Sequence, residues 1–540
     1  MASIQLSLRL CKSGVSLKTV VDSFDDMKPY KADRGFVLIS QKKEGVPDWL
    51  SVLRSESLSK IPDLHTMSCG AAYVMEVQYK AKKYVVAYTF GTAHHRLEDD
   101  LFEPRFGLRV ALNLIESNKL RNMDVASLDA STLKTRMQAS RSTSVNDFGL
   151  DVNQDLLTLL SGASSDASFA RAVTGRDAIS MRAMPSAGFF KDKAIQAIEI
   201  YKKRTYKSKY PWVDYIDPVK DSVVLAALER DLFDELVQIA SGHPTDASLS
   251  TPDISDPLVA EAVTYAGAGM RPGKKKVFDE IDIYDYVSEI KASLLGGRLA
   301  MDEMRASHRI VMEDQATGIP RSERVFRSIN FEVSRAGLRY VLFGGSWYQV
   351  DAKHAKSVED EFNSFLIPKA IFKPTTARNE RQYIEELNSR SDLLNMDQTK
   401  IDPAGTTQAN IEPCDFLSTK KHLIHLKDAA ASSSMSHLWS QGQVSCTLMM
   451  TDGIFREKFI KEAKKRETKY KKKGFSELLP SKSAAPDPSK FTVVFGVMRA
   501  RNRKNGQLDV PFFSKVAMRP SLTAIRLMSY KVFVEIIEKV

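Results

Sequence analysis

Two short runs near residue 420 place an acid and a lysine where they could act on a phosphate ester. The run 411–417 contains Asp415, and the run 422–427 ends at Lys427. Both runs are rich in apolar residues, and the polar residues 418–421 between them are typical of a turn, so we expect a hairpin. Carboxylate oxygens bind Mg²⁺, and a lysine beside the metal can orient or deprotonate an attacking water. The pattern therefore suggests metal-dependent phosphodiester chemistry.

Alternation along the second strand assigns its residues to two faces. Leu423, His425 and Lys427 share one face, and Ile424 and Leu426 lie on the other. Asp415 can thus lie across the hairpin from the face that bears the histidine and the lysine.

The arrangement resembles the PD-(D/E)xK nuclease core, in which a helix carboxylate, an Asp on one strand and an acid-x-Lys on the next surround a magnesium ion. A helix is expected from Tyr383, and the resemblance makes Glu386, or alternatively Glu385, its carboxylate. Asp415 would then be the strand acid and Lys427 the motif lysine, with Mg²⁺ or Mn²⁺ held by Asp415 and Glu386.

His425 stands where that nuclease family has an acid. Imidazole is a poor ligand for magnesium, so His425 is either a tolerated variant or the sign of a degenerate site. We keep it among the candidate catalytic residues. An ordinary hairpin with an exposed lysine would match the pattern in part as well.

The residues after the hairpin, 429–442, predict a helix with a serine-rich start. His437 and Gln441 are four residues apart on one face of it, with Ser434 nearby. Free N–H groups and hydroxyls at a helix start bind phosphate, so these three side chains are candidate nucleic-acid contacts. The alternative is that they are merely exposed on a helix packed by its apolar residues.

The chain is basic, with 78 Lys and Arg against 67 Asp and Glu and a net charge of +11. Ten Lys or Arg and three acids fall between Arg456 and Lys473, and a second cluster covers 499–504. Clustered cations release counterions when they meet phosphates, so we expect nucleic acid, DNA above all, as partner. A solvated helix and loop is the alternative. The candidate phosphate contacts are Lys464, Lys465, Lys471, Lys472, Arg499, Arg501 and Arg503.

At 540 residues the chain exceeds what one core organises, so several domains are expected. Residues 1–130 predict a mixed α/β domain around a hairpin with strands at 72–78 and 84–90. Residues 131–323 predict a mostly helical middle region with loose linkers, the loosest over 132–185.

Residues 324–540 predict an α/β domain. Within it Ile329–Val333 and Leu338–Phe343 flank a short loop with a glycine, and Asp351 can cap the helix that follows. The fold class is therefore mixed α/β and multidomain, with a hairpin domain at the amino end and a restriction-endonuclease-like core at the carboxyl end.

Membrane and secreted classes are disfavoured. No run reaches the roughly 18 uncharged apolar residues of a membrane span. Arg9 and Lys12 interrupt the place of a signal-peptide core. The four cysteines are far apart and lack zinc-site spacing. We expect a cytoplasmic protein with no membrane partner.

Over most of its length the chain resembles the DUF6119 family, a sporadically distributed bacterial family of roughly this length. The segments that carry the resemblance are YTFG at 88–91, RFGL at 105–108, WYQVD at 347–351, EPCD at 412–415, HLK at 425–427, SHLWSQG at 436–442 and PFFSK at 511–515. In this family a histidine before the lysine is usual.

The patchy distribution of the family implies horizontal transfer, which is common among genes for defence against phage. The resemblance thus implies an antiphage protein that binds nucleic acid and cleaves DNA with a metal. Two alternatives stay open, a non-catalytic nucleic-acid-binding scaffold with a degenerate nuclease core and a sensor of a phage protein. We also expect a homo-oligomer, with a second defence protein or a phage protein as further candidate partners.

Overall fold

A computed structural model describes the chain except for residues 1–2, 25, 41–42, 47, 57–60, 128–133, 149–154, 246, 251–260, 274, 315–319, 408, 429–432, 485 and 503–505. The fold is mixed α/β, as the sequence predicts. One compact unit comprises Met1–Ala126 and Lys134–Asp214, and a second is made mainly of Tyr215–Val540. No helix in the described ranges is long and apolar enough to cross a membrane.

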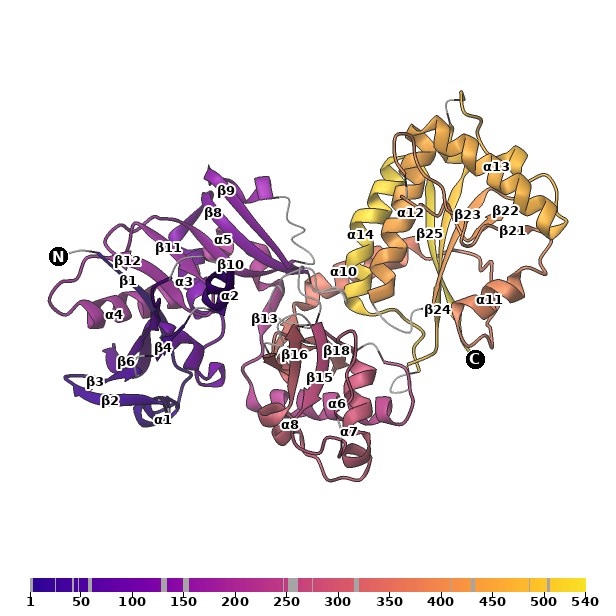
Figure 1. Ribbon diagram of the computed structural model, residues 1–540. Helices are drawn as coiled ribbons and strands as arrows, with labels where there is room; N and C mark the ends of the chain where they lie inside the picture. The colour runs from indigo at the N-terminus through magenta and orange to yellow at the C-terminus, as the bar shows by residue number, and fades with distance from the viewer. Residues whose placement is uncertain are drawn as a thin grey trace. The chain divides into compact units, whose positions relative to one another are not determined.

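The first unit is built on a ten-stranded sheet in the order β2-β3-β6-β7-β1-β12-β11-β10-β8-β9 (Figure 1). Its strands are β1 (Ile4–Leu10), β2 (Met27–Ala32), β3 (Gly35–Ser40), β6 (Gly70–Tyr79), β7 (Lys82–Gly91), β8 (Ile115–Ser127), β9 (Lys134–Thr143), β10 (Asp155–Ser164), β11 (Ala172–Gly175) and β12 (Ile179–Ala183). The helices are α1 (Leu17–Asp22), α2 (Asp48–Glu56), α3 (Phe106–Leu114), α4 (Phe189–Lys202) and α5 (Tyr206–Lys209), and β4 (Lys43–Gly45) pairs with β5 (Thr66–Ser68).

The predicted amino-terminal hairpin is confirmed. Strands β6 and β7 pair without a break from Gly70↔Gly91 to Tyr79↔Lys82, around a two-residue turn in which Lys80 adopts a φ of 52°. A left-handed first turn residue matches the right-handed twist of the flanking strands.

The segment 132–185, expected to be a loose connection, instead supplies four strands of this sheet. Strand β12 pairs with β1 from Ile4↔Ala183 to Leu8↔Ile179, and so completes the unit. These strands are rich in Ser, Thr and Arg and are held by main-chain pairing, which leaves little hydrophobic periodicity in the sequence. The expected middle region therefore divides near Asp214 between the two units.

The second unit contains three sheets. Their orders are β13-β20-β19-β18-β14, β15-β16-β17 and β21-β22-β23-β24-β25. The strands are β13 (Ile216–Pro218), β14 (Ser248–Leu249), β15 (Glu261–Ala266), β16 (Arg309–Asp314), β17 (Pro320–Arg324), β18 (Ile329–Arg335), β19 (Leu338–Phe343), β20 (Ser346–Val350), β21 (Leu393–Asn395), β22 (Phe416–Ser418), β23 (His422–Asp428), β24 (Thr492–Arg499) and β25 (Lys531–Glu538).

The helices of this unit are α6 (Ser222–Ala240), α7 (Ile283–Leu295), α8 (Met301–Ser307), α9 (Val325–Ser328), α10 (Ala352–Phe365), α11 (Glu380–Leu387), α12 (Ser433–Thr451), α13 (Gly453–Tyr470) and α14 (Phe512–Leu527). The predicted hairpin β18–β19 and the cap on α10 are confirmed. The carboxylate of Asp351 accepts from the N–H groups of Lys353 (3.0 Å) and His354 (2.9 Å).

The last sheet is covered on both faces (Figure 1). Its first three strands are antiparallel, and β23, β24 and β25 are parallel. Helices α12, α13 and α14 bury one face in a core that includes Leu423 and Phe495. Helix α11 buries the other face in a core that includes Tyr383, Ile424 and Leu426. The apolar residues of β23 thus alternate between the faces as predicted.

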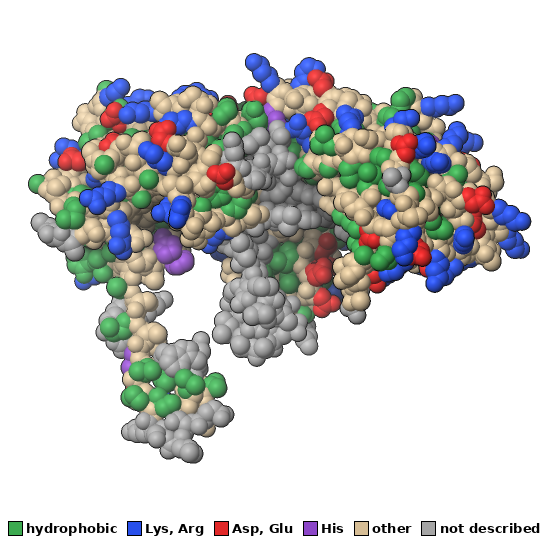
Figure 2. Space-filling model, turned by 90° about the horizontal axis from the view of Figure 1, so that it is seen from above, with side chains coloured by type: hydrophobic (Ala, Val, Ile, Leu, Met, Phe, Trp, Pro, Cys, Tyr) green, Lys and Arg blue, Asp and Glu red, His purple; other side chains and the backbone are tan. Residues whose placement is uncertain are grey.

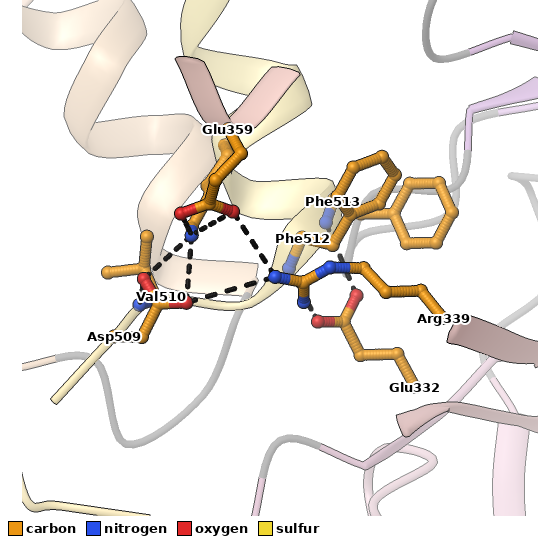
Figure 3. A network of polar contacts seen from close by, with 8 residues as sticks. Glu332, Arg339, Glu359, Asp509, Val510, Phe512 and Phe513 are labelled. Atoms are coloured by element: carbon orange, nitrogen blue, oxygen red, sulfur yellow. Dashed lines mark hydrogen bonds and ion pairs between the residues drawn. The ribbon is translucent and has the colours of Figure 1, made fainter. Parts of the chain in front are cut away.

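A polar network joins α14 to the neighbouring hairpin and to α10 (Figure 3). The ammonium group of Lys515, whose side chain is 0% exposed, lies 2.7 Å from Glu359 and 2.7 Å from Asp509. Arg339 of β19 lies 3.2 Å from the same Glu359. Glu332 of β18 accepts from the first N–H groups of α14, at 2.5 and 3.2 Å. The two carboxylates beside the Lys515 ammonium group compensate for its burial.

Candidate functional site

The predicted strand acid and motif lysine lie on neighbouring strands, with a helix carboxylate beside them. Asp415 immediately precedes β22, and Lys427 lies near the end of β23. Glu380, the first residue of α11, contacts Lys427 and also acts electrostatically on Asp415. The three side chains therefore form one cluster, although they come from three elements.

Asp415 is held by the two strands on either side of it. Its N–H donates to the carbonyl of Ile424 (2.8 Å), and its carbonyl accepts from the N–H of Met396 (2.7 Å). Its Oδ2 accepts from the N–H of Leu426 at 2.6 Å, where a strand carbonyl would otherwise stand. The side chain is buried and its position is fixed by main-chain groups.

The environment of Asp415 disfavours its negative charge. Burial raises its pKa to about 8, although the bond from the Leu426 N–H opposes the shift. The charges of Asp397, Glu380 and Glu412 raise it further. Asp415 is therefore largely protonated at neutral pH unless a cation enters the cluster.

Lys427 forms an ion pair with Glu380, with Nζ 3.0 Å from Oε2. Both side chains are about one-third exposed, at 33% and 29%. Glu380 also accepts weakly from the N–H of Asp428 at 3.3 Å. The pair thus lies at the solvent edge of the cluster, where a ligand could reach it.

The helix carboxylate differs from the one that the sequence indicated. Glu386 accepts from the hydroxyl of Thr375 at 3.0 Å, while Glu380 contacts Lys427. The helix, expected from Tyr383, begins at Glu380, because the side chain of Asn379 accepts from the N–H of Gln382 at 3.0 Å. Asn379 followed by an acid is a helix-start signal that the sequence contains.

Two further acids that the sequence did not indicate, Asp397 and Glu412, also act on Asp415. With Glu380, Asp415 and Lys427 they form what we call the acidic cluster. Burial and the charge of Glu380 raise the pKa of Asp397, while Arg466 of α13 and Lys427 oppose this shift. Glu412 accepts from the amide of Gln441 at 3.0 Å, so this predicted contact residue of α12 reaches the cluster.

His425 lies inside the core. Its ring stacks on Phe495 with centroids 5.5 Å apart, and neither ring nitrogen has a hydrogen-bond partner among the described residues. Burial lowers its pKa to about 4, so the ring is neutral at physiological pH. Gly442 of α12 lies over this pair, and any side chain there would clash with the Phe495 ring. His425 is thus a packing residue, and its environment makes it a poor candidate for catalysis.

Helix α12 is described from Ser433 onward, and residues 429–432 of the predicted range 429–442 lie outside the described residues. It contains Ser434 and His437, but their side chains lie outside the described residues. Leu438 and Trp439 are buried, as the packed-helix alternative requires.

The predicted basic residues divide into exposed and structural side chains. Lys464 and Lys465 of α13 are exposed, although Lys465 is paired with Glu462 at 2.6 Å, and Lys471 is exposed just after the helix. Lys472 instead donates to the carbonyls of Asn388 (3.1 Å), Arg390 (2.8 Å) and Leu393.

The second predicted basic cluster, residues 499–504, is less available for contacts with phosphates. Arg499 is half-buried at the end of β24, Arg501 binds both carboxylate oxygens of Glu538 (2.6 and 2.9 Å), and Arg503 lies outside the described residues. On the face drawn in Figure 2, basic side chains are spread out with acidic ones among them. Fewer of the predicted basic residues are therefore free to contact phosphates than the number of Lys and Arg in these two segments suggests.

The carboxylates offer hard oxygen ligands of the kind that Mg²⁺ and Mn²⁺ prefer. Among the described residues, however, no three His, Cys, Asp or Glu side chains lie close enough to hold a metal ion by themselves. Mg²⁺ commonly binds one or two carboxylates and takes its remaining ligands from substrate phosphates and water. Asp415 and Glu380 fit that partial role.

Comparison with known proteins gives one match. No curated protein and no solved structure matches the chain. Residues 6–538 match DUF6119, described as a family of unknown function, and this range includes the acidic cluster, β23 and the network around Lys515. The chain therefore belongs to the DUF6119 family.

Proposed function

We propose that the second unit binds nucleic acid and cleaves DNA at the acidic cluster with the help of a divalent metal ion. The observation that carries the proposal is the ion pair between Lys427 and Glu380 beside the buried Asp415. A helix acid, a strand acid and a lysine on the next strand are three of the parts that the PD-(D/E)xK resemblance requires, and His425 stands in place of the fourth, the acid two residues before the lysine. Placing Glu380 in the role first given to Glu386 brings the three parts into one cluster.

Each residue has a distinct role in this proposal. Asp415 and Glu380 would hold Mg²⁺ or Mn²⁺, and the ion would polarise the scissile phosphate. The buried Asp415 carboxylate is repelled by its acidic neighbours, so a bound cation would favour its ionised form. Lys427 can leave Glu380 and orient the attacking water or contact a phosphate oxygen. Gln441 positions Glu412 at the edge of the cluster.

The exposed lysines of α13 would supply phosphate contacts for the same substrate. Lys464 and Lys471 are exposed and make no ion pair with any described residue. Phosphate contacts make affinity fall with salt, by roughly tenfold or more between 50 and 200 mM if several are made. Affinity for DNA that does not change with salt would contradict this part of the proposal.

The test is cleavage of labelled single- and double-stranded DNA with Mg²⁺ or Mn²⁺. Asp415→Asn keeps an oxygen that can accept from the Leu426 N–H but removes the charge, and Glu380→Gln removes the partner of Lys427. We expect both variants to lose activity while remaining folded. Glu386→Gln is the matched control, because it changes an acid of the same helix that contacts Thr375, and it should cleave like wild type.

A second candidate function is non-catalytic binding of nucleic acid or sensing of a phage protein. It is favoured by the buried His425, which stands where the nuclease family has a metal-binding acid. Calorimetric titration with Mg²⁺ or Mn²⁺ in the presence of a phosphorothioate oligonucleotide separates the two. Metal uptake that Glu380→Gln abolishes supports the enzyme, and DNA binding without metal uptake supports the scaffold.

The biological setting that we propose is defence against phage in the cytoplasm, by a homo-oligomer that acts alone or with a second defence protein. Its support is the patchy distribution of the family. Plaque counts on bacteria that carry the wild-type gene should fall relative to bacteria that carry Glu380→Gln. Equal plaque counts across a broad panel of phages would contradict this setting.

A further inference from the structure

The tip of the β6–β7 hairpin and the end of α4 form a basic surface in the first unit, which we name the tip surface. Residues 79–84 contain three lysines and no acid, and residues 202–209 contain five Lys or Arg and no acid. Two tyrosines, Tyr79 and Tyr84, lie among these cations. The surface belongs to a different unit from the acidic cluster and was not among the predicted binding residues.

Packing of α4 on the hairpin brings the two segments together. Near the start of α4, Phe190 makes edge contacts with Tyr73, Tyr88 and Phe90, at 5.0 to 6.2 Å between centroids. The hydroxyl of Tyr88 donates to the carbonyl of Phe190 at 2.6 Å. The helix is therefore anchored on the hairpin by its first turn.

The last turn of α4 reaches the hairpin tip. Lys202 Nζ lies 4.8 Å from the Tyr79 ring centroid and 4.5 Å from that of Tyr84, and it donates to the Tyr84 hydroxyl. Lys80 Nζ lies 5.6 Å from the same Tyr79 ring. Two ammonium groups thus lie over the half-buried ring of Tyr79, where the negative face of the ring attracts them.

Most cations of the tip surface have no acid to neutralise them. Lys203, Lys207 and Lys209 are paired with Glu199, Asp214 and Glu116. The others make no ion pair within the part of the chain that the structure describes, and all are exposed: Lys80, Lys82, Lys83, Lys202 and Arg204. A cation at a helix end also offsets the helix dipole, which accounts for Lys202 but not for the three hairpin lysines.

We propose that the tip surface binds single-stranded nucleic acid, with the lysines moving onto its phosphates and a base stacking on the Tyr79 ring that they leave. Unpaired cations on one small surface repel each other, and a row of phosphates removes that repulsion and releases counterions. An aromatic ring among the cations is what distinguishes a single-strand site from a general polyanion site, because only unstacked bases can lie on it. The proposal adds a binding surface to the function proposed above and does not depend on cleavage.

The test measures binding of a fluorescein-labelled 20-nucleotide single strand and its duplex to the full chain by anisotropy, over a salt series without divalent metal. The tip variant is Lys80→Gln/Lys82→Gln/Lys83→Gln. The matched control is Lys12→Gln/Lys18→Gln/Lys31→Gln, which removes three exposed lysines of the same unit that make no ion pair with any described residue. A third variant, Tyr79→Leu, keeps all the charges.

We expect the tip variant to lower the slope of log affinity against log salt by about 2 for the single strand, since each lost contact removes about 0.7. The control variant should lower this slope by less than half as much as the tip variant does. Tyr79→Leu should weaken single-strand binding by about tenfold and leave heparin binding unchanged. Equal losses in the tip variant and the control, or equal losses of DNA and heparin binding in Tyr79→Leu, would overturn the proposal.

The outcome is independent of the proposed active site. The binding assay contains no divalent metal ion, so a chain that cannot cleave DNA can still show the binding predicted here. If wild type cleaves DNA and the tip variant binds the single strand as tightly as wild type does, the tip surface is refuted and the cleavage proposal is not. Wild type that fails to bind the single strand at 50 mM salt also refutes the tip surface.

Discussion

Lys427 and Glu380, 47 positions apart in the sequence, form an ion pair of 3.0 Å at the edge of the acidic cluster. The pair joins the start of a helix on one face of the sheet to the end of its central strand. We expect Lys427→Ala to lower the rate of DNA cleavage by about 10²–10⁴-fold without loss of fold, because it removes the group that orients water. Initial rates and melting curves check this.

The control for that variant is Lys539→Ala. Lys539 pairs with Asp428, the next residue of the same strand, at 2.8 Å, so its loss perturbs a neighbouring ion pair of the same kind. Similar rate losses in the two variants would indicate a general effect of strand-end ion pairs and no special role for Lys427.

Asp415 should make the stability of the metal-free protein depend on pH. Its folded pKa, about 8, exceeds the usual value of 3.8, so the folded state holds a proton that the unfolded state has lost between these two pH values. The stabilisation that Asp415 adds to the free energy of unfolding is therefore complete below about pH 4 and is lost as the pH rises towards 8. The free energy of unfolding of Asp415→Asn, relative to wild type, should therefore increase from pH 5 to pH 8 in EDTA. Urea unfolding measures it, and a constant difference would contradict the raised pKa.

His425 should have the opposite effect. Its folded pKa, about 4, lies below the usual value of 6.5, so its contribution to stability is complete above about pH 6.5 and is lost as pH falls through 4. His425→Leu fills a similar volume and cannot ionise. Its stability relative to wild type should rise as pH falls from 7 to 4 in urea unfolding, with the difference at pH 7 as reference. A relative stability that stays flat over this range would mean that the ring is not buried as a neutral group.

The network around Lys515 should be the most sensitive part of the second unit. Lys515→Met leaves Glu359 and Asp509 facing each other without their shared cation, and we expect a loss of about 3 kcal/mol in the free energy of unfolding. Lys356→Met is the control, because that lysine forms an exposed pair with Asp360, and it should cost less than about 1 kcal/mol. Similar losses in the two variants would contradict a structural role for the buried network.

The first unit should fold only with its late strands. A fragment of residues 1–130 lacks β12, which pairs with β1, and lacks Phe190, which packs on the β6–β7 hairpin. We expect residues 1–214 to melt cooperatively and residues 1–130 to melt broadly. A sharp transition in the shorter fragment would show that the hairpin forms a core by itself.

The sequence alone determined the local features of this protein. The β6–β7 and β18–β19 hairpins, the cap at Asp351 and the alternation along β23 all follow from residues within a few positions of each other. Period-two patterns, turn residues and caps act through the nearest backbone groups, so they can be predicted without knowledge of the rest of the chain.

Only the tertiary structure decided which residues meet. Lys472 looks like Lys464 in the sequence, yet it holds three carbonyls of the segment 388–393 because the chain after α13 returns to it. Glu380 replaces Glu386 beside Lys427, and His425 is enclosed by α12 and Phe495. These outcomes depend on contacts between segments that are distant in the sequence. The free energies of such contacts come from burial and from the pairing of charges. A local sequence pattern contains neither, so it cannot predict them.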